Sequence, residues 1–297
     1  MNKRRLFAII GLVFAFTGLI CFGVSIFCRT ENNIVVNLGL ASTFIAFIFV
    51  FILNRKSKPQ EETELHTQYL DDRMLETPSI AVAQAMRETE RMGQIAAASL
   101  DQSITAFIEK DTEAAQKVQK KEDLINFLNH EITTYLVKIG QTERCSADDV
   151  ALVGSLYHVI NDIERIGDHA ENIAEYAIHR VKEDIPFSTL AEEQLEEMRT
   201  RVMALLDVAE RCFHTRDRSL LSDAIEMEDE IDDLERDLQQ NHVDRLAQGL
   251  CTPQSGMIFS DMLSNLERVA DHATNIAFSI ASEEQPEIPK ETADSRA

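Results

Sequence analysis

The sequence predicts an all-α protein in which two transmembrane helices precede a six-helix domain made of two tandem antiparallel three-helix bundles. Two long apolar runs near the N-terminus predict the membrane helices. Beyond them, apolar residues recur at spacings of three, four and seven, which is typical of amphipathic helices. One twelve-residue pattern occurs twice, which indicates that a three-helix unit has been duplicated.

The charge balance excludes one large class of partner. The chain has 297 residues with a formal net charge of −22, and residues 59–297 alone carry −28. Nucleic acids are bound by clustered Lys and Arg, so no nucleic-acid partner is expected. The five Cys residues are scattered and contain no CxxC pair, which favours reduced thiols in a cytosolic or membrane setting.

The first apolar run, 6–28, contains no charged residue, and the second run covers 34–53. Each is long enough to cross a hydrocarbon core of about 30 Å as a helix. A signal peptide fits poorly because the first run is too long and no A-x-A site follows it. Basic residues flank the hairpin at 3–5 and at 55–58, while only Arg29 lies between the spans. We therefore expect a two-pass protein of the inner or plasma membrane, with its N-terminus and its acidic remainder in the cytoplasm.

The rest of the chain divides into a charged linker, a helical domain and a tail. With the hairpin at 1–58, we expect the linker at 59–77, the domain at 78–284 and a disordered tail at 285–297. Thr77-Pro78 and Thr252-Pro253 are helix-start signals, and Ser146-x-x-Asp149 and Thr189-x-x-Glu192 have the pattern of capping boxes. The expected helices are 78–108, 111–140, 146–183, 189–214, 217–248 and 253–284.

The duplication is visible when the chain is compared with itself. Residues Ile163–Ala174 match Leu266–Ala277 at an offset of 103, with eight of twelve positions identical. Upstream, the segment around Glu122 matches the segment around Glu228 at an offset of 106. The repeats are therefore expected at 78–183 and 189–284, each with room for a core of its own.

Paired carboxylates recur within the repeats. Glu164 and Asp168 lie four residues apart and share one side of their helix, beside the apolar stripe, and Glu228 and Asp232 hold the same relation on the fifth predicted helix. If these sides face one another, the carboxylates repel unless a cation lies between them, and such oxygen ligands suit Mg²⁺, Mn²⁺, Ca²⁺ or iron. The alternative is that Arg165 and its counterpart in the second repeat neutralise the acids as surface ion pairs.

The His and Asn residues of the repeated pattern are weaker candidates for metal ligands. His169 and His272 follow the Asp residues and are expected to cap a groove or face solvent rather than to join a metal centre. Asn172 and Asn275 are candidates for hydrogen bonds across helices. No His has a Glu three positions before it, and the sequence has no P-loop, nucleophile elbow or dinucleotide fingerprint, so we expect no enzymatic activity.

The doubled pattern E-R-[IV]-x-D-H-x-x-N-I-A resembles the PhoU family of phosphate-uptake regulators. Residues 69–81, YLDDRMLETPSIA, are similar to the junction between the membrane and cytoplasmic PhoU-like domains of bacterial sodium/phosphate cotransporters. The resemblance implies two three-helix bundles, multinuclear metal centres held by E(D)-x-x-x-D motifs, and a role in controlling phosphate transport. The metal ions would be divalent or trivalent, with Fe, Mn, Mg or Zn as candidates.

Carried over by position, the resemblance implies one ligand set in each repeat. The first set is Glu122, Asn126, Glu164 and Asp168, and the second set is Glu228, Asp232, Glu267 and Asp271. Asn126 departs from the family pattern, which has an acid there. A neutral amide supplies less negative charge, so weaker metal binding is expected in the first repeat.

The membrane part also departs from the cotransporter pattern, because only a hairpin precedes the junction and it contains no Q-S pair. We therefore expect a regulatory domain on a minimal anchor, acting on a phosphate transporter or a phosphate-sensing membrane protein, with a homo-oligomer as a candidate assembly. An accessory subunit or truncated member of a sodium/phosphate cotransporter is the first alternative. A helical scaffold with vestigial metal motifs is the second.

Overall fold

The structure is a computed structural model that describes residues 65–142 and 144–281. The described residues contain six α-helices and two 3₁₀ turns and no strand, which confirms the all-α prediction. The helices are α3 (Pro78–Glu109), α4 (Thr112–Gly140), α5 (Ala147–Lys182), α6 (Thr189–Thr215), α7 (Leu221–Ala247) and α8 (Pro253–Ala281), and the turns are η1 (Asp72–Glu76) and η2 (Arg218–Leu220).

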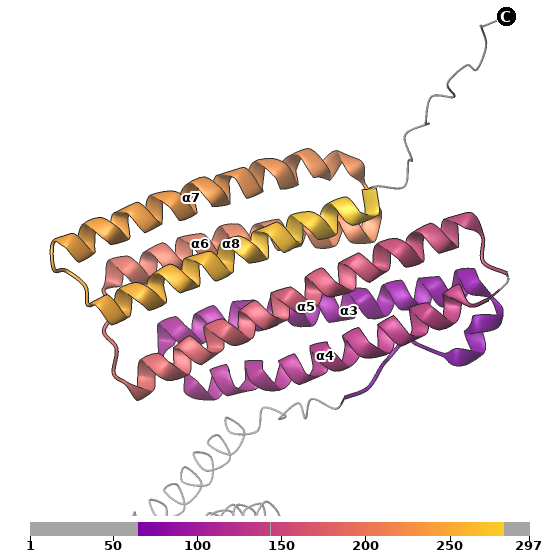
Figure 1. Cartoon of the computed structure of the whole chain (residues 1–297), viewed down its shortest axis with the longest axis horizontal. Helices are drawn as coiled ribbons and strands as arrows, with labels where there is room; N and C mark the ends of the chain where they lie inside the picture. Colours follow the sequence, from indigo (N-terminus) through magenta and orange to yellow (C-terminus); the bar gives the residue numbers. More distant parts are fainter. Residues whose placement is uncertain (1–64, 143, 282–297) are drawn as a thin grey trace, which may run out of the picture. The chain divides into compact units, whose positions relative to one another are not determined.

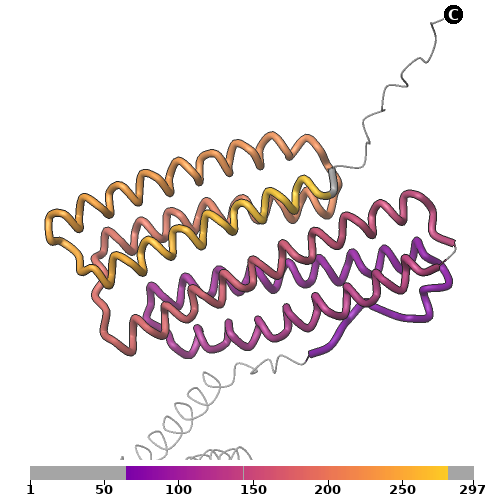
Figure 2. The backbone as a smooth tube through the Cα atoms, in the orientation of Figure 1, coloured from indigo at the N-terminus to yellow at the C-terminus, as the bar shows by residue number. Residues whose placement is uncertain are grey.

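The helices form two three-helix bundles, as the duplication predicts. Helices α3, α4 and α5 pack on one another, and so do α6, α7 and α8 (Figure 1). The bundles join where α5 packs on α8 and α3 packs on α6. The α3–α4, α5–α6 and α7–α8 connections all lie at one end of the helical domain (Figure 2). Residues far apart in sequence therefore come together at that end.

Two helix starts differ from the sequence prediction. The fifth predicted helix begins at Leu221 rather than at 217, because the Asp217 side chain accepts a hydrogen bond from Ser219 N and the chain makes the 3₁₀ turn η2 first. Ser188, not Thr189, caps α6, accepting a hydrogen bond from Ala191 N through its hydroxyl. The capping box at Ser146 and Asp149 is confirmed.

The two bundles differ in how completely the middle helix is buried. On α4 ten residues are buried, and all of them except Glu122 and Tyr135 are aliphatic. On α7, the equivalent helix, only Ala224, Ile231, Leu238 and His242 are buried. Acidic and amide side chains take up much of the surface of α7, so this helix contributes less apolar area to its core.

Arg180 connects the first bundle to the start of the second. Its side chain is 1% exposed, and the guanidinium lies 4.9 and 4.7 Å from the ring centroids of Phe107 and Phe187. Nη1 donates to Phe107 O at 2.8 Å, and Nη2 donates to Glu192 Oε1 at 2.5 Å. One buried cation therefore holds the end of α3, the α5–α6 connection and the first turn of α6.

The described residues that precede α3 pack onto the first bundle. Buried Glu88 accepts hydrogen bonds through Oε2 from Gln68 N at 2.8 Å and from Tyr69 N at 2.6 Å. Tyr135 on α4 donates its hydroxyl to Asp71 O at 2.9 Å. The second half of the predicted linker thus has defined contacts with α3 and α4.

The two predicted transmembrane helices belong to a part of the chain that the structure does not describe. In the part of the chain that the structure describes, no helix has both the length and the apolar composition needed to cross a bilayer. The predicted spans, 6–28 and 34–53, lie outside the described residues.

Replacing Arg180 is expected to destabilise the helical domain. The R180M variant keeps much of the side-chain volume but removes the bonds to Phe107 and Glu192, so the free energy of unfolding should fall by about 2 to 4 kcal/mol. Urea unfolding followed by circular dichroism measures the change. Arg211 is an exposed arginine 3.8 Å from Asp207, and R211M should change the same quantity by less than about 0.5 kcal/mol. Equal effects of the two variants would contradict the role given to Arg180.

Candidate metal centres

Three members of the first predicted ligand set, Glu122, Glu164 and Asp168, lie near one another between α4 and α5. Burial first, and then the negative charge of Asp168 and other neighbouring acids, raises the pKa of Glu122 to about 8. The same two causes, in the same order, raise the pKa of Glu164. Carboxylates from two helices are therefore close enough to repel one another. Asn126, one turn beyond Glu122, is exposed.

Glu122 is the most buried member of this set because of a glycine on the facing helix. Glu122 is 4% exposed, and neither of its carboxylate oxygens has a hydrogen-bond partner. A Cβ added at Gly167 on α5 would lie 2.5 Å from Glu122 Oε2. The missing side chain at Gly167 therefore leaves the space that the carboxylate occupies.

The second predicted ligand set comes together between α7 and α8. Burial is the first cause that raises the pKa values of Glu228, Asp232 and Glu267, and the charge of Asp271 contributes to all three. Asp232 Oδ1 is buried without a hydrogen-bond partner. Asp271 on α8 occupies the position of Asp168 on α5, so each repeat has an equivalent aspartate among its acids.

The second set is more open than the first. Ala270 stands where the first repeat has Gly167, and Glu228, the counterpart of Glu122, is only half-buried. The two repeats therefore present similar acids at different depths.

The sequence analysis left out further acids that lie near the predicted sets. The negative charge of Glu171 and Asp123 contributes to the raised pKa of Glu122, and that of Glu235 contributes to the raised pKa of Glu267. Glu171 lies seven residues after Glu164, two helical turns along the same side of α5, so its spacing was a usable signal.

The ion-pair alternative is realised in part. Arg165 forms ion pairs with both acids: its Nη1 is 3.3 Å from Asp168 Oδ2, and its Nε is 3.8 Å from Glu164 Oε2. The Arg165 side chain is exposed. Such pairs contribute about 0–1 kcal/mol in water. Arg165 therefore offsets some charge at the rim and leaves the buried Glu122 without a counter-charge.

The histidines of the repeated pattern lie at the contact between the bundles. The rings of His169 and His272 are 5.8 Å apart between centroids. His169 Nδ1 lies 2.7 Å from Asn265 Oδ1, His272 Nδ1 lies 2.9 Å from Asp162 Oδ1, and Asn172 Nδ2 donates to Asn265 Oδ1 at 3.4 Å. The expectation that the histidines cap a groove or face solvent is wrong for His169, which is buried.

The acids have the chemistry of cation ligands, but their side chains are not arranged around an ion site in this structure. Buried carboxylate oxygens without partners, on Glu122 and Asp232, are donors of the kind that hard cations prefer. Within residues 65–142 and 144–281, however, no group of three or more His, Cys, Asp or Glu side chains is arranged to hold an ion. An ion would bind only after carboxylates on the facing helices rotate towards one another.

The fold and the repeated acids define a class of duplicated three-helix-bundle proteins with two equivalent carboxylate clusters. The family model described as "PhoU domain" matches this chain twice, over residues 89–177 and 195–280. The chain therefore belongs to the PhoU domain family. The two matches begin 106 residues apart, the offset at which Glu122 corresponds to Glu228.

Similar proteins and structures agree with this family. The chain is 27% identical over 189 residues to a phosphate-specific transport system accessory protein PhoU homolog of Thermotoga maritima, covering 64% of this chain and 81% of that protein. It is 23% identical over 234 residues to a putative inorganic phosphate export protein of Escherichia coli, covering 78% of this chain and 42% of that protein. The crystal structure of PhoU from Pseudomonas aeruginosa aligns with a TM-score of 0.64 at 23% identity, covering 68% of this chain and 96% of that one, which shows the same fold.

Glu122 is expected to make the stability of the metal-free protein depend on pH. The folded protein keeps this proton up to about pH 8, whereas the unfolded chain releases it near the ordinary value of 4.5. The folded state thus binds up to one more proton between these values, and the free energy of unfolding should fall as pH rises through them, with a slope of up to about 1.4 kcal/mol per pH unit. Urea unfolding in EDTA across this range measures the slope.

The E122Q variant should lose that part of the slope, because the amide does not titrate. Glu113, exposed on the same helix, provides the matched control E113Q, which should keep the wild-type slope. The same slope in E122Q and wild type would show that Glu122 does not carry the effect.

Proposed function

We propose that this chain is a membrane-anchored, metal-binding regulatory protein that controls phosphate uptake and phosphate homeostasis without catalysing a reaction. Membership of the PhoU domain family supports the link to phosphate, since relatives bear names of phosphate transport accessory proteins. The observation that supports the metal part is that each repeat gathers acids from two facing helices and leaves a buried carboxylate oxygen without a hydrogen-bond partner, on Glu122 in the first repeat and on Asp232 in the second.

The proposed membrane anchor would place the regulatory domain near membrane proteins. The uncharged runs 6–28 and 34–53 support a two-pass hairpin with the PhoU domain on the cytoplasmic side. A tether raises the effective concentration of the domain near membrane partners, within the reach of its linker. The proposed partner is a phosphate transporter or a phosphate-sensing membrane protein.

One observation favours a second candidate function. The match to the putative phosphate export protein extends over 234 residues, longer than the match to the PhoU homolog of Thermotoga maritima. The chain could then serve as an accessory subunit or truncated member of a sodium/phosphate cotransporter, with its hairpin packed against transport helices of another chain. A scaffold without bound metal is the remaining alternative.

Metal analysis of the purified full chain tests the carboxylate clusters. At limiting metal, E267A/D271A should remove more bound metal than E164A/D168A, because Asn126 weakens the first site, and the fourfold variant should remove nearly all. Elemental analysis by mass spectrometry after gel filtration gives the metal-to-protein ratio. Equal losses from the two double variants would contradict the predicted difference between repeats.

A matched control replaces four exposed acids outside the clusters. The variant E113A/E193A/E226A/D237A removes the same formal charge from exposed positions and should retain the wild-type metal content. If the control and the cluster variant bind as much metal as the wild type, the scaffold alternative is favoured.

Phosphate uptake distinguishes the regulatory function from transport. Vesicles that contain only this chain should take up no more labelled phosphate than protein-free vesicles. In cells, the fourfold cluster variant should shift phosphate uptake towards that of cells lacking the chain. Uptake by vesicles of the chain alone would contradict a purely regulatory role, and uptake that requires a second membrane protein would favour the subunit.

A further inference from the structure

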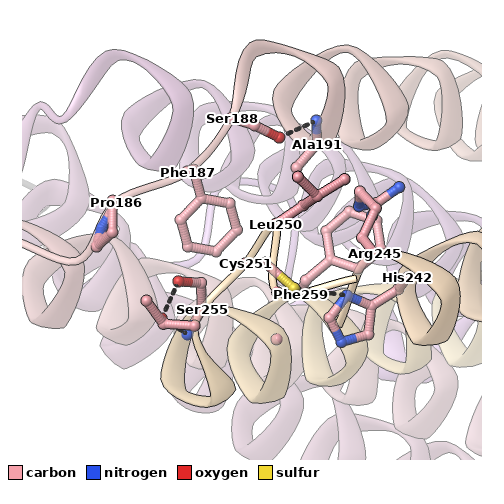
Figure 3. A pocket seen from close by; sticks show the side chains of 13 residues that line it. Pro186, Phe187, Ser188, Ala191, His242, Arg245, Leu250, Cys251, Ser255 and Phe259 are labelled. Atoms are coloured by element: carbon pink, nitrogen blue, oxygen red, sulfur yellow. Dashed lines mark hydrogen bonds between the residues drawn. The ribbon is translucent and has the colours of Figure 1, made fainter. Parts of the chain in front are cut away.

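A cavity of about 370 Å³ lies at the end of the second bundle where the α5–α6 and α7–α8 connections meet (Figure 3). It is bounded by residues 186–188, the last turns of α7, the connection to α8 and the first turns of α8. Phe187, Leu250 and Phe259 supply apolar walls. His242, Arg245 and Ser255 supply polar groups, and none of the 13 lining residues is Asp or Glu.

Arg245 brings a positive charge without a partner to this cavity. Its Nη2 is buried and has no hydrogen-bond partner, and its guanidinium carbon lies 5.1 Å from the Phe259 ring centroid. Among the described residues no carboxylate forms an ion pair with it, whereas Arg180, buried nearby, has Glu192. In a chain with a net charge of −22, an arginine left unpaired in a cavity free of acids marks a place that favours an anion.

The first repeat shows what this end of the bundle looks like without a cavity. At the offset of 106, Leu136 and Ile139 stand at the positions of His242 and Arg245, and both are fully buried. Leu156 stands at the position of Phe259. The first bundle thus closes its equivalent end, near the α4–α5 connection, with aliphatic side chains. The second bundle has polar and aromatic side chains there and remains hollow, although packing alone would favour the aliphatic set.

His242 occupies its place because of a glycine on the facing helix. The residue is 7% exposed, and burial followed by the charge of Arg245 lowers its pKa. A Cβ added at Gly256 would lie 2.6 Å from both Cε1 and Nε2 of this ring. The first repeat has Val153 at the position of Gly256. The second repeat thus has His242 in place of Leu136 and Gly256 in place of Val153. The glycine leaves the space that the imidazole ring occupies in the cavity wall.

The connection between α7 and α8 forms the rim of the cavity. Gly249, with φ +68°, takes the left-handed conformation that ends α7, and Leu250 N donates to Arg245 O at 2.9 Å. The Leu250 side chain is 66% exposed. At the start of α8, Ser255 N donates to Thr252 Oγ1 at 3.1 Å, and the positive end of the helix dipole adds to the charge of Arg245.

We propose that this cavity binds a nucleoside monophosphate, with the phosphate facing Arg245 and the first turn of α8 and the base packing against the apolar wall formed by Phe187, Leu250 and Phe259. A guanidinium suits a phosphate group, and aromatic rings suit a flat base. The volume lies within the range of small-molecule sites and exceeds what inorganic phosphate alone would fill. None of the acids of the two clusters lines the cavity, so the site goes beyond the proposed function and does not depend on it.

Isothermal titration of the full chain in EDTA with three ligands tests the proposal. AMP should bind at least tenfold more tightly than adenosine, which lacks the phosphate, and than ribose 5-phosphate, which lacks the base. Inorganic phosphate should bind no more tightly than ribose 5-phosphate. Absence of AMP binding at millimolar concentration, or equal affinity for AMP and either half-ligand, would overturn the proposal.

Variants connect the binding to the cavity. R245Q should weaken AMP binding at least tenfold, and G256V, which restores a branched side chain at the cavity wall, should weaken it as well. Arg236 is exposed on the same helix and pairs with Asp233, so R236Q should bind AMP as the wild type does. Circular dichroism of each variant checks that its helices remain folded. Wild-type affinity in folded R245Q would overturn the assignment.

The carboxylate-cluster variant separates this site from the metal function. E164A/D168A/E267A/D271A should bind AMP with the wild-type affinity, because none of its four residues lines the cavity. Loss of metal with retained AMP binding would support two separate sites. Loss of AMP binding in this variant would overturn the independence of the two sites and with it the placement of the nucleotide.

Discussion

Negative charge held between facing helices is the constraint on which this structure depends. In each repeat, acids from two helices lie close enough to raise one another's pKa, and the deepest of them, Glu122, has no hydrogen-bond partner for either oxygen. Such charge is unfavourable in a low-dielectric environment unless a proton or a cation compensates it. Protonation compensates this charge at Glu122, and the metal ion of the proposed function would act on the same carboxylates.

The two repeats solve the same packing problem in different ways. The backbone arrangement is shared, but Gly167 leaves space for the buried Glu122 in the first bundle, whereas the second bundle has Ala270 at that position and its carboxylate, Glu228, is half-buried. Near the C-terminal end of the middle helix the difference is reversed. There Leu136 is fully buried in the first bundle, and His242 with Gly256 opposite it lines a cavity in the second. Glycine replacements on one helix thus decide where polar groups enter each bundle.

Much of the fold could be predicted because its signals are local. Apolar spacing and capping residues identified all six helices among the described residues, and the error at Leu221 arose because the side chain of Asp217 starts a 3₁₀ turn that periodicity does not report. Helical spacing identified Glu164 with Asp168 and Glu228 with Asp232, and the family resemblance supplied the other members of the two sets. Glu171 was not predicted, although it lies seven residues after Glu164, because the family pattern E(D)-x-x-x-D contains only two acids.

The sequence by itself determined the helices, the duplication and the side of each helix on which the acids lie, since all of these follow from the fixed turn of the α-helix. Tertiary packing alone decided which sides meet. It buried Glu122 against a glycine 45 residues away and brought Phe187 to the same cavity as Arg245. A missing Cβ matters only when another chain segment comes within about 3 Å, and no local pattern records that approach.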